Sequence, residues 1–184
     1  MATASVARVF NSQTNQEARQ IQEGRQIQEI TNTHIWVDAD ACPVQIKDIL
    51  VRTSKRLQLQ LTFVANQSIK VARTELVQLI VVHDGADVAD DLIAERANEG
   101  DIVITQDIPL AARVVEKNAV AIGPRGEIFD DKSVHSRLAS RNLMEQFRSA
   151  GHETRGPKPL DSRDVQAFAN ALDRTITRCR KKQK

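Results

Sequence analysis

From residue 34 onward the sequence alternates short apolar runs with stretches in which apolar residues recur every three or four positions. The runs have the length and the Val, Ile and Leu content of buried strands, whereas the stretches between them have the spacing of amphipathic helices. Strands and helices in regular alternation predict βαβ units and therefore a largely parallel sheet. We expect strands at 35–37, 59–64, 76–82, 102–105 and 120–122.

Helices are expected between most of these strands and after the last one. The first has an apolar stripe that contains Ile46, Ile49 and Leu50. Two further helices are expected at 133–150 and from 162 onward, and the Gly-Pro-Lys-Pro segment between them requires a loop. The predicted fold class is therefore α/β, a three-layer sandwich with a central, mostly parallel sheet.

The length of the chain suits one domain with additional segments at its ends. Residues 1–33 are rich in Gln, Asn, Ser and Thr, so we expect a disordered or loosely helical extension before an α/β domain at 34–173. Residues 174–184 hold six Lys and Arg, and we interpret them as a basic tail. The other 173 residues carry a net charge of −4, against +2 for the whole chain of 184.

Three features bear on where the protein works. The most apolar run, 76–82, is far shorter than the ~18 residues that indicate a membrane span. The N-terminus lacks the apolar block of a secretory signal. Two cysteines, Cys42 and Cys179, cannot form the disulfide framework of a small secreted protein. We expect a cytoplasmic protein with no membrane partner, in which Cys42 is a small buried residue.

Acidic residues follow three of the predicted strands. Asp38 and Asp40 come after the first strand, Asp87 and Asp90 after the third, and Asp107 after the fourth. In an open parallel sheet, the carboxyl ends of all strands lie along one edge, and ligands bind at that edge. We therefore expect these five carboxylates to meet in space.

Carboxylates with no histidine in the same motifs suit a hard cation, so Mg²⁺ or Mn²⁺ is the expected cofactor rather than zinc. Such an ion polarises a phosphoryl oxygen and acidifies a bound water, and a free carboxylate can accept the proton of that water. Single acids also have a structural interpretation, because Asp87 and Asp107 occupy N-cap positions and Asp90 the third position of a helix. The set of five, rather than any member, favours a metal site.

Several motifs in one order resemble the YaiI/YqxD family over residues 34–173. They are Trp36-Val-Asp-Ala-Asp-Ala-Cys-Pro43, Val64-Ala-Asn-Gln-Ser68, Gly85-Ala-Asp-Val-Ala-Asp90, Ile104-Thr-Gln-Asp-Ile-Pro-Leu-Ala111 and Pro124-Arg-Gly126. This family is bacterial, largely uncharacterised, and similar in fold to the PIN-domain nucleases.

PIN-domain nucleases use an acidic cluster with Mg²⁺ or Mn²⁺ to hydrolyse RNA or DNA. The resemblance therefore implies a PIN-like domain with metal-dependent nuclease activity. It implies catalytic roles for Asp38, Asp40 and Asp107, and metal ligation by these three together with Asp87 and Asp90. These are the same residues that the ends of the strands select.

Three basic residues are candidates for weak phosphate binding. Arg137 and Arg141 share a face of the helix expected at 133–150, and Lys158 lies in the following loop. On the helix face, an ion pair between Arg141 and Glu145 is the alternative interpretation. Aromatic residues make up 3% of the chain, so binding would occur mainly through phosphates. Nucleic acid is the expected partner, and RNA is preferred over DNA.

Two other functions stay open at this stage. Asp38-Ala-Asp40 also fits the start of the haloacid-dehalogenase phosphatase motif, in which Asp38 would form an aspartyl intermediate. Cys42 occupies the place where that motif has Thr or Val. Alternatively, the acids only cap helices, and the chain is a non-catalytic module that binds nucleic acid or protein.

Overall fold

The computed structural model describes residues 33–82, 85, 87–149 and 158–182, and the side chains of 142–149 lie outside that description. Within these ranges six strands form one sheet in the order β3-β2-β1-β4-β5-β6. All neighbouring strands pair in parallel except β6, which runs antiparallel to β5. The strands are β1 Ile35–Asp38, β2 Leu61–Ala65, β3 Val77–Val81, β4 Ile102–Ile104, β5 Val120–Ile122 and β6 Ile128–Phe129.

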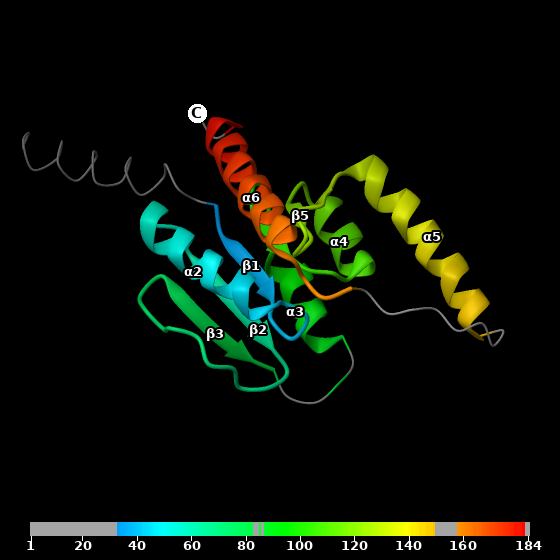
Figure 1. Ribbon diagram of the computed structural model, residues 1–184, viewed down its shortest axis with the longest axis horizontal. Helices are drawn as coiled ribbons and strands as arrows, with labels where there is room; N and C mark the ends of the chain where they lie inside the picture. Colours follow the sequence, from blue (N-terminus) through cyan, green and yellow to red (C-terminus); the bar gives the residue numbers. More distant parts are fainter. Residues whose placement is uncertain (1–32, 83–84, 86, 150–157, 183–184) are drawn as a thin grey trace, which may run out of the picture.

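Helices cover both faces of the sheet (Figure 1). α2 (Val44–Leu57) and α6 (Ser162–Lys182) contribute to the core on one face. α3 (Val88–Arg96) and α4 (Ile108–Val115) contribute to the core on the other. α5 (Asp131–Ser149) contacts α4 and extends to one side of the molecule. The predicted three-layer α/β sandwich is confirmed.

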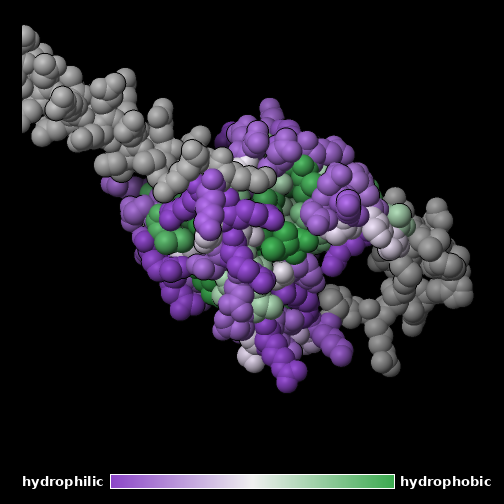
Figure 2. Space-filling view, turned by 90° about the horizontal axis from the view of Figure 1, so that it is seen from above, coloured by the Kyte–Doolittle hydropathy of each residue, from purple (hydrophilic) through white to green (hydrophobic). Residues whose placement is uncertain are grey.

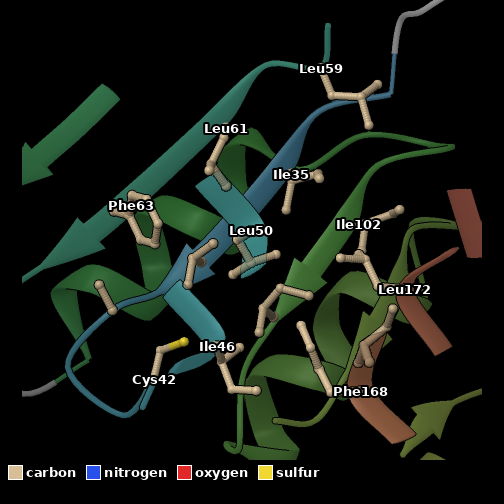
Figure 3. Packing of buried hydrophobic residues seen from close by; sticks show 14 of the residues in the cluster. Ile35, Cys42, Ile46, Leu50, Leu59, Leu61, Phe63, Ile102, Phe168 and Leu172 are labelled. Atoms are coloured by element: carbon tan, nitrogen blue, oxygen red, sulfur yellow. The ribbon is translucent and has the colours of Figure 1, made fainter. Parts of the chain in front are cut away.

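Successive strand residues point into different cores, because side chains alternate along a strand. Ile35 and Val37 of β1 join the cluster under α2 and α6, whereas Trp36 joins the cluster under α3 and α4. Figure 3 shows the first cluster, in which Leu50 of α2 and Phe168 of α6 lie against the sheet. Each large side chain buried in this way contributes about 1.5–3 kcal/mol to stability. A shift of β1 by one residue would exchange the two faces, so burial fixes the register in which the strand ends at Asp38.

α6 continues through the segment that the sequence assigned to a basic tail. Thr175, Ile176 and Cys179 are buried, and Ile176 and Cys179 belong to the core under α2 and α6. The domain boundary predicted at 173 therefore moves to the end of α6. Arg174 and Arg178 lie on exposed positions between these buried residues, whereas Arg180 is half-buried and donates to the Leu57 carbonyl at 2.8 Å.

The strand predicted at 120–122 coincides with β5, the other four differ from the observed strands by one or two residues at their ends, and β6 was not predicted. Residues 1–32, expected to form an extension, lie outside the described residues. In the described part of the chain, no helix is both long and apolar enough to cross a bilayer. The face in Figure 2 is mostly hydrophilic and shows small, separate hydrophobic patches.

Candidate functional site

The end of β1 lies at the point where the sheet reverses its strand order. β1 pairs with β2 on one side and with β4 on the other. From β1 the chain continues into α2 on one face of the sheet, and from β4 it continues into α4 on the opposite face. Loops that leave in opposite directions open a crevice between them, which is where open α/β sheets bind ligands. Asp38 ends β1 at this crevice, and Thr105 directly follows β4.

Asp38 is buried at the crevice with 8% of its surface exposed. Its Oδ2 accepts a hydrogen bond from the Thr105 hydroxyl at 3.0 Å. Burial raises the pKa of Asp38, and the negative charges of Asp40 and Asp107 raise it further, against the lowering effect of hydrogen bonds from Thr105 and the Ala41 backbone. The fold therefore holds this carboxylate where its ionised form is disfavoured.

Thr105 connects two of the predicted acids. Its hydroxyl donates to Asp38 and accepts from the backbone N–H of Asp107 at 2.9 Å. Because the accepted bond fixes the direction of the hydroxyl hydrogen, Thr105 orients the Asp38 carboxylate. Sequence reasoning missed this role and treated Thr105 as the end of a strand. The available signal was a hydroxyl residue two positions before an acid, directly after a buried strand.

Asp107 has two different partners. One carboxylate oxygen accepts from the Leu110 backbone N–H at 3.1 Å, which makes Asp107 the N-cap of α4 as the structural interpretation proposed. The other oxygen pairs with Nη1 of Arg141 at 2.6 Å. Arg141 therefore reaches across from α5 to the acids, which the sequence did not predict.

Asp87 and Asp90 flank the start of α3. Asp87 occupies the N-cap position with φ 71° and makes no side-chain cap hydrogen bond, so the cap interpretation does not account for it. Burial raises the pKa of Asp90 to about 6, together with the negative charges of Asp38, Asp107 and Asp87, while Arg113 lowers it. Asp90 is thus close enough to three other predicted acids to be affected by their charges.

Asp40 is exposed, and its Oδ2 accepts from the Asn66 backbone N–H at 2.7 Å. This bond ties the loop after β1 to the loop after β2. The negative charge of Asp40 also acts on Asp38. The structure therefore gathers the predicted acids at one edge of the sheet, and we call this group the acid centre: Asp38, Asp40, Asp87, Asp90 and Asp107.

The donor chemistry of the acid centre fits Mg²⁺ or Mn²⁺, since it offers carboxylate oxygens that repel one another. Among the residues that the structure describes, no three His, Cys, Asp or Glu side chains are already arranged around one point as metal ligands. To share an ion, the carboxylates would have to come closer to one another. Cys42 is buried as predicted, and burial raises the pKa of its thiol to about 12, which makes it a poor nucleophile.

The other two predicted phosphate contacts line a cavity of about 270 Å³. Arg137 reaches it from α5, with its guanidinium carbon 5.2 Å from the centre of the Phe129 ring. Lys158 reaches it from the segment before α6. Gln106, the residue between Thr105 and Asp107, is also part of the wall. Arg137 and Lys158 therefore lie beside the acid centre, whereas Arg141 contacts it directly.

Residues 36–178 match the family described as "Uncharacterized BCR, YaiI/YqxD family". The chain belongs to the YaiI/YqxD family. The family match includes every member of the acid centre and most of α6, which agrees with a domain that extends beyond residue 173. No solved structure matches the chain.

Bacterial relatives carry the name UPF0178 protein. The one from Acidithiobacillus ferrooxidans is 54% identical over 145 residues, which are 79% of this chain and 99% of the relative. The one from Hydrogenovibrio crunogenus is 47% identical over 79% of this chain and 96% of its own length. The UPF0178 protein Bpet3884 from Bordetella petrii is 53% identical over 78% of this chain and 95% of its own length. These YaiI/YqxD relatives therefore share nearly their whole length with this chain.

Proposed function

We propose that this protein is a metal-dependent nuclease that hydrolyses phosphodiester bonds at the acid centre. The observation that supports this best is the burial of Asp38 among other carboxylates at the crevice between β1 and β4. Such repulsion opposes folding, and the core does not require it, because apolar residues would fill the same space. A divalent cation would offset the repulsion.

Asp38, Asp40, Asp87, Asp90 and Asp107 would hold the ion. A bound Mg²⁺ or Mn²⁺ would polarise a phosphoryl oxygen and lower the pKa of a water molecule bound to it. Thr105 fixes the orientation of Asp38, and the Asp107 cap fixes that side chain at the start of α4. Arg141 already pairs with Asp107 and lies where a guanidinium can contact a phosphate.

Two features favour this proposal over the alternatives. A phosphatase of the haloacid-dehalogenase type needs an accessible Asp38 oxygen as nucleophile, but Asp38 is 8% exposed and one oxygen accepts from Thr105. A non-catalytic module in which the acids only cap helices does not explain Asp87, which makes no side-chain cap bond. The three basic residues near the acid centre suit a nucleic acid, and RNA is the preferred substrate.

The test is hydrolysis of labelled single-stranded RNA, single-stranded DNA and a generic phosphodiester, each with Mg²⁺, with Mn²⁺ and with EDTA. The wild-type protein should cleave RNA in the presence of metal and lose this activity in EDTA. Asp38→Asn should lower the rate at least about 100-fold, the scale of losing a group that acts in the transition state. Asp173→Asn, a matched change at an exposed aspartate of α6, should leave the rate unchanged.

Equal cleavage by wild type and Asp38→Asn would show that the activity does not come from the acid centre. Loss of activity accompanied by a phosphorylated Asp38, trapped in the wild type with a small phosphoester and found by mass spectrometry, would favour the phosphatase mechanism instead. Thermal unfolding of each variant separates a lost reaction from a lost fold.

A further inference from the structure

The cavity beside the acid centre shares a wall with it. Gln106 lines the cavity, and its Nε2 donates to the Ala41 carbonyl in the loop that holds Asp40. Pro43, at the end of the same loop, lines the cavity as well. A ligand in the cavity would therefore lie next to any phosphate held at the acid centre.

Two positive charges at the cavity are available to a ligand. Arg137 and Lys158 are exposed, and in the described ranges neither forms an ion pair with another side chain. Arg125, in contrast, pairs with Asp164 and also donates to the Lys158 carbonyl, which ties the segment before α6 to the turn at 123–126. The Phe129 ring beneath Arg137 orients its guanidinium and leaves the N–H groups free for an anion.

The rest of the wall is mixed: Pro43, Ile108 and Leu160 form an apolar part, whereas Gln106 and Glu127 are polar. Glu127 is the one acid among the lining residues, against the three bases Arg125, Arg137 and Lys158. A cavity of about 270 Å³ is near the lower limit for small-molecule sites. It can take a single nucleotide, with the base on the apolar part of the wall, but it cannot admit a base-paired duplex.

α5 presents arginines to both places. Arg137 lies at the cavity and Arg141 at Asp107, and their separation of four positions corresponds to about 6 Å along the helix axis. A nucleic-acid strand that runs along this face of α5 would meet one arginine at the acid centre and the other at the cavity. The spacing suits consecutive nucleotides of one strand.

We propose that the cavity holds one nucleotide of a single-stranded nucleic acid next to the bond that is cut, with its phosphate on Arg137 and Lys158. The inference rests on the proposed nuclease function, since the acid centre defines where that bond lies. It makes single-stranded chains the substrate class. The 158–160 segment, which Arg125 holds through the Lys158 carbonyl, would then position the Lys158 side chain for the phosphate.

The test measures binding without cleavage, by fluorescence anisotropy of a labelled eight-nucleotide RNA in EDTA. Arg137→Gln and Lys158→Gln should each weaken binding about tenfold and lower the slope of log affinity against log salt by about 0.7, as expected for one lost phosphate contact on a single strand. Arg174→Gln removes the same charge from an exposed position of α6 and should have little effect. Uridine monophosphate should compete better than uridine or inorganic phosphate.

If Arg174→Gln weakened RNA binding as much as the two cavity substitutions, the effect would come from the overall charge of the protein, and the inference would be wrong. The inference would also be wrong if a duplex of the same sequence bound as tightly as the single strand and lost as much affinity on the two cavity substitutions. It would be wrong as well if the wild type failed to bind the RNA. Cleavage is scored separately with Mn²⁺. Binding that follows this pattern without any cleavage would refute the nuclease proposal alone, and cleavage that is unaffected by the cavity substitutions would refute the cavity alone.

Discussion

Asp38 and Asp101 are both buried and lie at opposite ends of the two central strands, yet they have different surroundings. Asp101 directly precedes β4, is 4% exposed, and accepts hydrogen bonds from the His34 N–H, the Trp36 indole and the Asn98 N–H at 3.0, 3.2 and 3.0 Å. Asp38 ends β1 and is affected by the negative charges of other acids. Asp101 thus has three hydrogen-bond donors, whereas Asp38, although it accepts from Thr105 and from the Ala41 backbone, is also exposed to the negative charges of Asp40 and Asp107.

This difference separates a structural acid from a functional one. A buried carboxylate with several donors stabilises the fold, because its lone pairs are satisfied and removing it would strand those donors. A buried carboxylate among like charges lowers stability and is explained by a ligand that is positive. The amino edge of the sheet therefore serves the fold, and we assign the carboxyl edge to function.

The largest expected effect is on stability and arises at Asp101, the structural acid. Asp101→Ala leaves three donors at or near the core without an acceptor, so it should lower the free energy of unfolding by about 3 kcal/mol, because each stranded buried donor costs about 1–3 kcal/mol. Urea unfolding followed by the fluorescence of Trp36, the single tryptophan, measures this loss.

A matched control is Asp173→Ala, which breaks an exposed pair with Arg56 and should cost less than about 0.5 kcal/mol. If Asp101→Ala lowered the free energy of unfolding no more than Asp173→Ala does, Asp101 would not be a structural acid, and the contrast between the two edges would not hold.

A smaller effect is expected at Asp90. Its pKa in the folded protein is about 6, above the ordinary value of 3.8, so its contribution to stability is fully present below pH 3.8 and is lost as the pH rises through about 6. Without metal, Asp90→Asn should therefore be more stable than wild type at pH 7.5 and show no such gain at pH 4. Solvent screens this half-exposed group, so the gain should stay below about 1 kcal/mol.

Thermal unfolding in EDTA at the two pH values measures this gain, and Asp91→Asn serves as the control from the exposed side of the same helix. Asp91 pairs with Arg113, so its replacement should not stabilise the protein at pH 7.5. A destabilised Asp90→Asn at pH 7.5 would indicate that Asp90 is a structural acid like Asp101.

The sequence predicted the strands well, because strands buried on both faces leave continuous apolar runs such as the one at 102–104. It also predicted that the strand-end acids share an edge, because parallel topology requires this. β6 was missed since two residues show no periodicity. The domain was predicted to end at residue 173 because the six charges after it were interpreted as a tail, although the apolar stripe of the last helix continues to Cys179 and is buried.

The contacts of individual side chains were harder to predict, because they depend on how distant segments meet. Asp101 was not singled out, since its donors include His34 and Trp36, more than 60 positions away. The ion pair between Arg141 and Asp107 depends on the path of α5 across α4. Thr105 was overlooked because a threonine at the end of a strand is common.

Calorimetric titration of Mn²⁺ into the metal-free protein at pH 7.5 tests the central claim most directly. We predict saturable binding at or below millimolar Mn²⁺ by the wild type and by Asp173→Asn, and its loss in Asp38→Asn. An absence of saturable binding in the wild type, or equal binding by Asp38→Asn, would contradict the account.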